Sequence, residues 1–390
     1  MFKAFKYRIY PTEPQKGLIA KHIGSSRFVY NLALETKSAA YISAKHNYSA
    51  FDLIKQLPEL KKECPWLKEV NSQSLQQSIQ NMDIAFKKFF KGAGFPKFKS
   101  KRDRQSFSIP QNVIVDNDLL IIPKFKEGIK MSLHRPTKGR VKSATISVTP
   151  TGKYFVSILC DTKEELPNKA PITENTTIGI DLGIKDFAIT SEGEVFENPK
   201  FLRKAQSKLK YIQRKYSKYK GKRTKKKLAK LHEDVANKRK DFLHKVSTQL
   251  IRENQTIALE TLAVKNMMKN HNLAQAINDV SWSTFVSMLE YKADWYGKNI
   301  IRIGQFTPSS KTCSCCGYIN KELTLKDRSW TCPKCNSVLD RDVNAAVNIK
   351  SFALKNTLSG GHRLKNQDEL PTLVGVMTLE AQPIAYGVGG

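Results

Sequence analysis

Polar and apolar residues alternate along residues 3–10 of the chain. A pattern of period two predicts a β-strand, and Pro11 is expected to end it. Thr12 and Gln15 follow at the spacing of a capping box, which satisfies free N–H groups at the start of a helix. Apolar residues then recur at helical spacing to about residue 92. The pattern therefore predicts a strand (1–10) followed by a helical region (11–92).

Short apolar runs replace the helical pattern after this point. A segment rich in Gly, Pro, Lys and Arg comes first, and turn-forming pairs such as Thr151-Gly152 separate the later runs. The runs predict strands at 107–109, 113–122, 129–134, 141–149 and 153–160. We expect these strands to form a small antiparallel β-barrel (93–165) that the N-terminal strand completes, and residues 161–175 to form a linker.

The most basic stretch of the chain is residues 201–240, with seventeen Lys or Arg and two acids, Glu233 and Asp234. Its apolar residues recur intermittently at helical spacing. A charged helix is usually solvated, but such helices mix both signs of charge. Seventeen positive charges repel one another strongly unless a polyanion lies beside them, so we interpret this stretch as a contact with nucleic acid.

The whole chain has the same imbalance, with 66 Lys and Arg against 35 Asp and Glu and a formal net charge of +31. Such a charge indicates a polyanionic partner, nucleic acid first and an anionic membrane surface second. No apolar run approaches the roughly 20 residues that span a bilayer. The N-terminus also lacks the apolar region of a signal peptide. We therefore expect a cytoplasmic, nucleoid-associated protein that does not engage a membrane.

Four of the seven cysteines form two Cys-x-x-Cys pairs with fifteen residues between them. This is the spacing of a tetrahedral zinc site, for which the ligands would be Cys313, Cys316, Cys332 and Cys335. Three cysteines remain, Cys64, Cys160 and Cys315. Because their number is odd and they are widely scattered, they indicate a reducing cytosol without disulfides. Cys315 lies between two ligands and could replace one by a shift of register, but only Cys313 and Cys316 keep the x-x spacing.

Three acids lie where apolar segments end. Asp181 is on a predicted strand, on the face that two glycines keep open, and Glu260 ends a second apolar strand. Asp342 lies near the start of a predicted helix, where the helix dipole favours the ionised carboxylate. Isolated carboxylates of this kind make a hard, oxygen-rich site suited to Mg²⁺ or Mn²⁺. Two such ions can activate water and stabilise the leaving oxygen in phosphodiester cleavage.

Each acid also has an ordinary structural explanation. Asp181 could close a turn, Glu260 could pair with a lysine, and Asp342 could cap a helix. Asp186 and Asp340 are weaker candidates, because Asp186 falls in a predicted hairpin turn and Asp340 is better placed to cap the helix. The order of the three acids, their strand contexts and the net charge favour the metal site.

Other polar and basic residues are candidates for contact with nucleic acid. One helix presents polar side chains that could read base edges, although a solvent-facing surface would look the same; they are Ser72, Gln73, Gln76, Gln77 and Gln80. Basic side chains of a loop and of the 201–240 stretch are suited to phosphates; they are Lys97, Lys99, Lys101, Arg102, Arg104, Lys222, Arg223, Lys225 and Lys226. Arg328, just before the second Cys pair, could steady a scissile strand.

Several motifs together resemble the TnpB family, the RNA-guided nucleases of insertion sequences that are related to type V CRISPR effectors. The resemblance covers about residues 1–355. Its carriers are YRIYPTEPQ, SQSLQQSIQNMDIAFKKFF, GFPKFKSKRDRQSF, GIDLGIKDFA, NKRKDFLHKVS, IALETL, SSKTCSCCG, WTCPKC and DRDVNAAVNI. The last four together are highly specific. Cys315 departs from the family pattern, in which a residue other than cysteine is usual.

The resemblance implies an α/β fold plus a small β-barrel. The implied parts are a wedge barrel (1–10 and 93–165), a helical recognition domain (11–92), an RNase H-like RuvC domain (171–305 and 341–358) with a basic helical insertion (201–250), a zinc ribbon (306–340) and a flexible tail (359–390). By motif, Asp181, Glu260 and Asp342 match the catalytic acids, and the four paired cysteines match the zinc ligands.

The implied partners are a guide RNA from the element's own end and double-stranded target DNA that carries a short adjacent motif. The protein is expected to act as a monomer with its RNA. Because all three acids are present, the sequence favours an RNA-guided, Mg²⁺-dependent DNA endonuclease. The alternatives are an RNA-guided DNA-binding regulator that does not cut, and a transposase or junction resolvase that needs no RNA. A resolvase would need little beyond the nuclease core, so the basic N-terminal half argues against the last.

Overall fold

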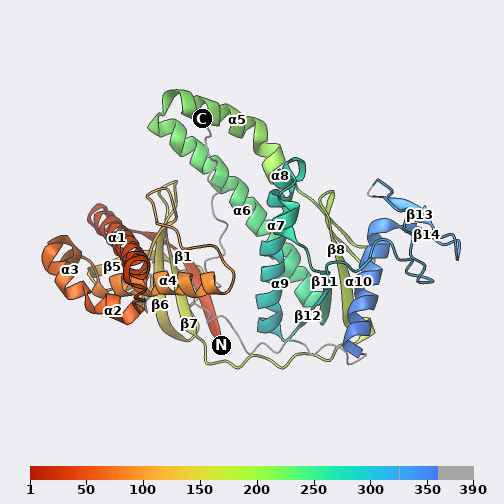
Figure 1. Ribbon diagram of the computed structural model, residues 1–390, viewed down its shortest axis with the longest axis horizontal. Helices are drawn as coiled ribbons and strands as arrows, with labels where there is room; N and C mark the ends of the chain where they lie inside the picture. Colours follow the sequence, from red (N-terminus) through yellow and green to blue (C-terminus); the bar gives the residue numbers. More distant parts are fainter. Residues whose placement is uncertain (325, 359–390) are drawn as a thin grey trace. The chain divides into compact units, whose positions relative to one another are not determined.

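The computed structural model describes residues 1–324 and 326–358 (Figure 1). The chain divides into two compact units, Met1–Glu164 and a second unit that begins at Glu165. The tail that the sequence analysis expects at 359–390 lies outside the described residues. Within the described part of the chain, no helix combines the length and the apolar character needed to cross a membrane.

The N-terminal unit is built on a seven-stranded antiparallel sheet with the order β2-β6-β7-β1-β5-β4-β3. The predicted strand at the N-terminus is confirmed, and it lies inside the sheet, paired with β7 on one side and β5 on the other. The strands are β1 (Phe2–Tyr10), β2 (Gln105–Ile109), β3 (Ile114–Asp116), β4 (Leu119–Ile122), β5 (Phe125–Ser132), β6 (Arg140–Val148) and β7 (Tyr154–Asp161). The run predicted at 113–122 is thus two strands joined by a turn.

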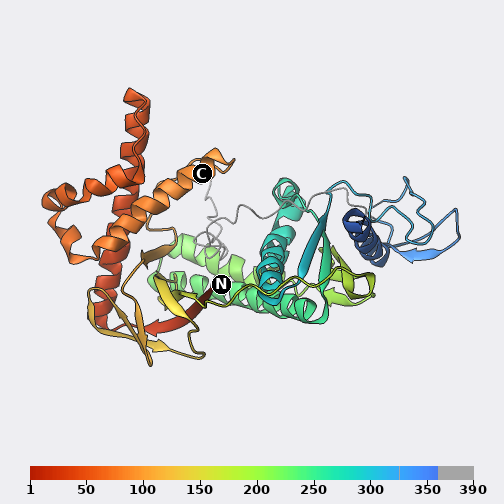
Figure 2. The ribbon, with the colours of Figure 1, turned by 90° about the horizontal axis from the view of Figure 1, so that it is seen from below.

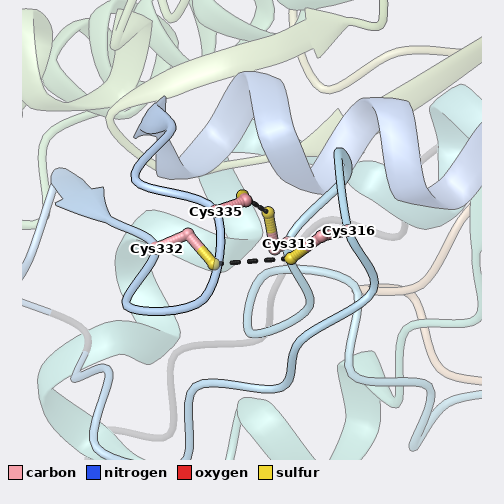
Figure 3. A group of neighbouring side chains, drawn as sticks. All are labelled: Cys313, Cys316, Cys332 and Cys335. Carbon is pink, nitrogen blue, oxygen red and sulfur yellow. Dashed lines mark hydrogen bonds between the residues drawn. The ribbon is translucent and has the colours of Figure 1, made fainter.

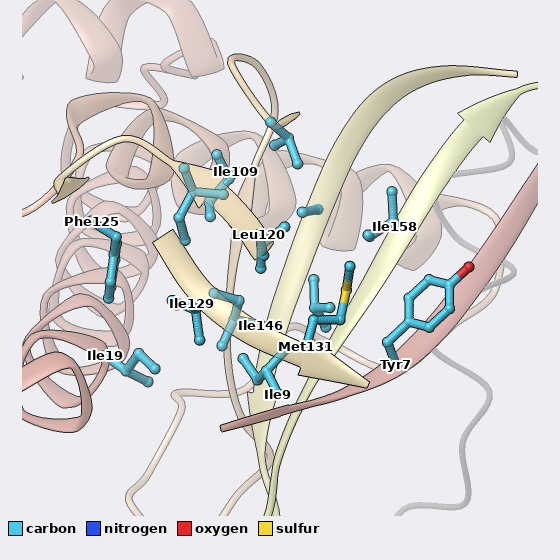
Figure 4. Close-up of a cluster of buried hydrophobic side chains, with 14 of the residues drawn as sticks. Tyr7, Ile9, Ile19, Ile109, Leu120, Phe125, Ile129, Met131, Ile146 and Ile158 are labelled. Carbon is cyan, nitrogen blue, oxygen red and sulfur yellow. The ribbon is translucent and has the colours of Figure 1, made fainter. Parts of the chain in front are cut away.

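One face of this sheet encloses a single apolar core (Figure 4). Ile9 of the central strand β1, Ile109 of the edge strand β2 and Leu120 of β4 belong to the same buried cluster, which Ile19 of the first helix joins. The sheet must curve strongly for these distant strands to share one core. Pairing among the described strands nevertheless ends at β2 and β3, so the expected barrel is observed as a curved, open sheet.

Helices fill the predicted helical region of this unit. They are α1 (Glu13–Ala44), α2 (Ala50–Lys55), α3 (Leu57–Glu63), a 3-10 turn (Pro65–Glu69) and α4 (Ser72–Phe90). The predicted helix start is confirmed, because the backbone N–H of Thr12 donates to Oε1 of Gln15 at 3.0 Å. Helices α1 and α4 pack against each other and share a second apolar core that includes Leu34, Leu75 and Met82.

The second unit contains a mixed five-stranded sheet with the order β10-β9-β8-β11-β12. Strands β8, β11 and β12 are parallel, whereas β9 and β10 add antiparallel pairs at one edge. The strands are β8 (Thr177–Leu182), β9 (Asp186–Thr190), β10 (Val195–Glu197), β11 (Thr256–Glu260) and β12 (Asn299–Ile303). The α/β character expected of this half of the chain is confirmed.

Helices cover both faces of this sheet (Figures 1 and 2). On one face, Ile180 and Leu259 pack into a large core with α6 (Lys222–Glu253), α8 (His271–Val280) and α9 (Trp282–Tyr296). On the other face, Ala258 packs against α10 (Arg341–Leu358). The remaining elements are α5 (Phe201–Tyr219), α7 (Val264–Met267), β13 (Ser329–Thr331) and β14 (Val338–Asp340).

The basic stretch folds as a helical hairpin of α5 and α6 (Figure 1). A narrow apolar seam joins the two helices, with Leu202, Leu209 and Val235 buried in it. The intermittent apolar spacing seen in the sequence is therefore the seam of this hairpin. At the base of the hairpin, Asp279 of α8 accepts hydrogen bonds from the Leu202 backbone N–H at 3.0 Å and from Arg239 at 2.7 Å.

Candidate functional site

Two of the three candidate acids lie on neighbouring parallel strands. Ile180 of β8 is directly opposite Leu259 of β11, so the next residues along the two strands are Asp181 and Glu260. Neighbouring strands are about 4.8 Å apart, and side chains alternate between the two faces of a sheet. Because Ile180 and Leu259 point into the core on one face, the two acids point to the opposite face. The face predicted for each acid is confirmed.

Helix α10 crosses this second face and carries the third acid. Asp342 is the second residue of α10. The helix packs so closely on β8 that a Cβ atom built on Gly179 would lie 2.1 Å from the carbonyl oxygen of Ala346 and 2.7 Å from the backbone nitrogen of Lys350. Only glycine fits there. Gly179 therefore lets the start of α10 come near the carboxyl ends of β8 and β11.

The pKa of Asp181 depends on the charges of the other two acids. Burial raises the pKa of Asp181 to about 7, and the nearby carboxylates of Asp342 and Glu260 add to the rise, while Arg341 opposes it. Burial also raises the pKa of Glu260. Carboxyl groups that resist ionisation in this way mark a place where a divalent cation would be strongly favoured.

Two arginines hold the carboxylate of Asp342. Nη1 of Arg328 donates to one oxygen at 3.2 Å, and Nη2 of Arg341 donates to the other at 2.9 Å. The backbone positions Arg328, since its carbonyl oxygen accepts a hydrogen bond from the N–H of Arg341 at 2.8 Å. Arg328 was a candidate from sequence for a different reason, whereas Arg341 was missed. Its place directly before Asp342 in the sequence was the available signal.

The two weaker acid candidates make other contacts. Oδ1 of Asp340 accepts hydrogen bonds from the backbone N–H groups of Asp342 at 3.0 Å and Val343 at 2.9 Å, so it caps α10. Asp186 begins β9 and lies 3.5 Å from the ammonium group of Lys185. The cap expected at Asp340 is therefore observed, whereas Asp186 begins a strand and does not lie in the predicted turn.

The four paired cysteines form one compact cluster (Figure 3). All of their sulfur atoms lie within 4.8 Å of one another. The Sγ atoms of Cys313 and Cys335 are 3.6 Å apart, as are those of Cys316 and Cys332. Zinc–sulfur bonds of about 2.3 Å place the corners of a tetrahedron roughly 3.8 Å apart, so this cluster fits a zinc ion. Cys315 is exposed and is not a member of the cluster.

The thiols of the cluster differ in acidity. Burial raises the pKa of Cys313 to about 12, whereas the hydroxyl of Ser337 lowers the pKa of Cys335 to about 6. The ligand form of cysteine is the thiolate, so the buried thiol is the one that needs the metal's charge to ionise.

Two asparagines of α10 join the cysteine cluster to the acid site. Asn344 accepts a hydrogen bond from the Ser314 N–H at 2.9 Å and donates to the Thr312 carbonyl oxygen at 2.8 Å. Asn348 donates to the same carbonyl at 2.6 Å and to that of Ser309 at 2.8 Å. Both side chains are buried. In the sequence both residues belong to the DRDVNAAVNI motif, and their spacing of four, which places them on one helix face, is the signal that could have identified this role.

The polar residues predicted to read bases lie on α4 but differ in exposure. Ser72 and Gln80 are exposed, whereas Gln73, Gln76 and Gln77 are half-buried. The side chain of Gln73 donates to that of Gln111 at 3.1 Å, and Gln77 donates to Asn81 at 3.2 Å. Contact with bases therefore stays a prediction, and the second N–H group of each bonded glutamine is left for it.

The basic loop candidates are exposed; they are Lys97, Lys99, Lys101, Arg102 and Arg104. They belong to the first unit, as do the α4 residues, whereas the acids belong to the second. Asn31 of α1 fixes the loop by accepting the Lys99 N–H at 2.8 Å and donating to its carbonyl at 2.9 Å.

Lys222, Arg223, Lys225 and Lys226 are exposed in the first turns of α6. The N-terminal end of a helix carries partial positive charge, which disfavours cations there. Their placement is explained most simply if an anion neutralises them, and contact with phosphate stays a prediction.

Three family models match the chain. A model described as "Probable transposase" (OrfB_IS605) matches residues 157–271, and one described as "Cas12f1-like, TNB domain" matches 282–349. A model described as "Helix-turn-helix domain" matches residues 1–46, which here contain β1 and the single long helix α1. The first two matches fall on the unit that holds the acids and the cysteine cluster.

Curated relatives match over nearly the whole chain. A protein of Streptomyces pristinaespiralis named "Putative RNA-guided DNA endonuclease" is 39% identical over 370 residues, covering 92% of this chain and 91% of that protein. The Escherichia coli K12 protein "Putative RNA-guided DNA endonuclease InsQ" is 31% identical, covering 89% of this chain and 91% of that protein. "TnpB-like protein L79" of Acanthamoeba polyphaga mimivirus is 27% identical over 90% of this chain and 73% of that protein.

The fold is also similar to that of a solved structure titled "Cryo-EM structure of the Cas12f1-sgRNA-target DNA complex". The TM-score is 0.53, and the match covers 90% of this chain and 98% of that chain at 13% sequence identity. At this identity the likeness concerns the fold alone.

Proposed function

This chain belongs to the TnpB family of IS605 OrfB-type proteins, and from that premise we propose that it is an RNA-guided DNA endonuclease of a transposable element. The observation that carries the proposal is the pair of acids, Asp181 and Glu260, on adjacent parallel strands, with α10 bringing Asp342 to the same face. Relatives named as RNA-guided DNA endonucleases support the guide RNA and the DNA target as partners.

The reaction we assign is hydrolysis of a DNA phosphodiester at the three acids. Asp181, Glu260 and Asp342 would hold Mg²⁺ or Mn²⁺, to which their hard oxygen ligands are suited. The bound cations would supply a water of lowered pKa and charge stabilisation for the leaving oxygen. Asp181 must be ionised to act as a ligand, and Arg341 beside it favours that form.

Arg328 would have a second role in the same site. Half of its side chain is exposed (51%), and its guanidinium group lies against Asp342. A planar guanidinium can bind two phosphate oxygens at once. We propose that Arg328 exchanges its bond with Asp342 for contact with the scissile strand.

The cysteine cluster would bind zinc and act structurally, since all four ligands come from the protein and leave no open position. We assign the curved sheet (1–10 and 93–165) as the wedge domain and the helices of 11–92 as the recognition domain. The RuvC domain is assigned to 171–305 and 341–358, with the zinc ribbon at 306–340.

Replacement of Asp181 by Ala tests the proposed function. In the presence of guide RNA and Mg²⁺, we expect D181A to bind matched DNA as the unaltered protein does but not to cut it. D186A is the matched control, because it removes an acid of the adjacent strand that pairs with Lys185, and it should cut normally. Equal cutting by D181A and the unaltered protein would refute the assignment. Loss of DNA binding as well would show that Asp181 is structural.

A further inference from the structure

The N-terminal unit contains a polar cavity of about 70 Å³. It lies between α1, α4, the basic loop and strand β2, and its walls include Ser26, Arg27, Asn81, Lys99 and Arg104. A water molecule needs about 10–15 Å³ measured in this way. The cavity therefore has room for a small group of four or five non-hydrogen atoms.

The walls of this cavity are positively charged. Arg27, Lys99 and Arg104 line it, and none of the described residues that line it is acidic. Arg27 donates to the side-chain oxygen of Gln105 at 3.1 Å, which is a neutral partner. The closest acid in sequence is Asp103, whose carboxylate accepts the backbone N–H of Ser100 at 2.6 Å. Three basic residues thus line this space, and no described lining residue carries a carboxylate, a composition that suits an anion.

The ammonium group of Lys99 is partly removed from water. The residue as a whole is exposed, but its ammonium nitrogen lies 3.8 Å from the centre of the Tyr30 ring, and Tyr30 is buried. Burial of the ammonium group lowers the pKa of Lys99 to about 8, although the carboxylate of Asp103, which does not line the cavity, opposes this fall. An anion in the cavity would compensate for the water that this group has lost.

Ser26 supplies a second, independent sign of a ligand. The residue is 6% exposed, and its Oγ atom is buried without a hydrogen-bond partner among the described residues. Buried hydroxyl groups almost always have a partner, because an unpaired one loses its bond to water without replacement. Ser26 lies in the wall of the cavity, so a bound group with acceptor oxygens would satisfy it.

We propose that this cavity receives one backbone phosphate of a nucleic-acid strand. A phosphodiester carries one negative charge and several acceptor oxygens, which matches the cations, the unpaired hydroxyl and the size of the cavity. The inference rests on the proposed function for its source of phosphate, since guide RNA and target DNA offer the same group. It assigns roles to Ser26 and Arg27, whose sequence context carries no signal for phosphate binding.

The dependence of binding on salt tests this proposal. Each phosphate contact adds about 0.7 to 0.9 to the slope of log Kd against log salt concentration. We expect Arg27→Gln to weaken binding about tenfold. The slope should fall by about 0.7 to 0.9, the value for one phosphate contact. Arg27→Lys, which keeps the charge, should keep the slope. Lys126→Gln is the matched control, because it makes the same change of charge at an exposed residue of β5 and should alter neither quantity as strongly.

The slope is measured twice, once for guide RNA alone and once for matched DNA added to the protein–RNA complex. A lower slope for RNA places the guide strand in the cavity, and a lower slope for DNA places the target there. Slopes unchanged in both would overturn the proposal. Thermal unfolding of each variant must show the normal transition, so that misfolding cannot imitate lost contact.

Ser26→Ala sharpens the result. If the hydroxyl donates to a phosphate, we expect affinity to fall about threefold to tenfold, as for the loss of one hydrogen bond. If Ser26 only packs, removing a buried unpaired hydroxyl should leave affinity unchanged and raise the unfolding temperature. All of these readouts measure binding. A protein that binds RNA but never cuts would refute the nuclease, whereas a cutting protein whose Arg27→Gln variant keeps its slope would refute only the phosphate cavity.

Discussion

The cysteine cluster and the three acids are two proposed metal sites of the same unit, built in opposite ways. The four cysteines come from one short stretch, and their sulfur atoms already lie at metal-binding distances. The acids come from β8, β11 and α10, and Asp342 is paired with Arg328 and Arg341. A local motif therefore carries its own geometry, whereas the positions of the three acids depend on the whole fold, and Arg328 and Arg341 already pair with one of them.

The two sites nevertheless meet on α10. Asn344 and Asn348 bind the backbone beside Cys313, two and six residues after Asp342. A change at the cysteine cluster should therefore reach the third acid. The following predictions test how far each site depends on the other, from the largest expected effect to the smallest.

Gly179→Ala should have the largest effect. The added methyl group would lie 2.1 Å from the Ala346 carbonyl oxygen, so α10 must move away from β8. Overpacking usually costs about 1–3 kcal/mol, and a clash with two backbone atoms of α10 places this change at or above that range. We expect cutting to be lost and the free energy of unfolding of the second unit to fall in a denaturant titration.

The control for that change is Gly24→Ala. Gly24 lies in α1, and nothing lies within 4 Å of an added Cβ atom there. Alanine favours helix over glycine by about 1 kcal/mol, so this variant should be as stable as the unaltered protein or more so. Normal cutting by Gly179→Ala would contradict the close packing of α10 on β8.

Cys332→Ser should remove most of the bound zinc, because Cys332 is buried within the cluster. We expect cutting to fall with the zinc content, since the hairpin of β13 and β14 leads directly into α10. The measurement is metal content by mass spectrometry beside the cutting rate. Cys315→Ser is the matched control and should retain zinc, and equal loss of zinc in both variants would mean that Cys315 is a ligand.

Asn344→Ala should weaken metal binding at the cysteine cluster and at the three acids, but less than Cys332→Ser weakens zinc binding. It removes the bonds to Ser314 and Thr312 without touching a sulfur or a carboxylate. Loss of supporting bonds around metal ligands typically costs about 10–100-fold in affinity. We expect a fall of that order in zinc affinity, measured by competition with a chelator, and a weaker response to Mn²⁺. The exposed Asn356→Ala on the same helix should change neither; a normal zinc affinity in Asn344→Ala would mean that the two sites are independent.

Asp181→Asn is the last change, and it tests the stability of the metal-free protein instead of zinc content or cutting. The pKa of Asp181 is raised from 3.8 to about 7, so in metal-free protein its ionisation disfavours the folded state as pH rises through this window. The variant cannot ionise. Its midpoint of thermal unfolding in a chelator should exceed that of the unaltered protein by a few degrees above pH 7, and the two should converge near pH 4. A difference that does not depend on pH would contradict the shift.

Much of this arrangement could be predicted from sequence, and the reasons differ between regions. The faces of β8 and β11 follow from strict alternation, and the cap at Asp340 follows from its place before an Ala- and Asn-rich helix. The cysteine pairs needed only their spacing. In each case the signal lies within a few residues, where local geometry decides the outcome.

Contacts between distant segments could not be read in the same way. No pattern in the sequence near Gly179 predicts that a helix more than 160 residues later packs against this residue. The pairing of Asp342 with Arg328, the asparagine contacts of α10 and the unpaired hydroxyl of Ser26 likewise depend on tertiary packing. Whether the expected barrel closes could not be predicted either, because alternation sets the face of each strand but not whether the edge strands pair.

The most direct test of the central claim is guided cutting by the natural complex. The protein would be purified after co-expression with the DNA that flanks its gene, its bound RNA sequenced, and a plasmid library with a matched target and a randomised adjacent motif challenged in the presence of Mg²⁺. The account predicts one specific RNA and cutting that requires both that RNA and a short adjacent motif. Motif-dependent binding without cutting would indicate a regulator, and the absence of a specific RNA would contradict the account.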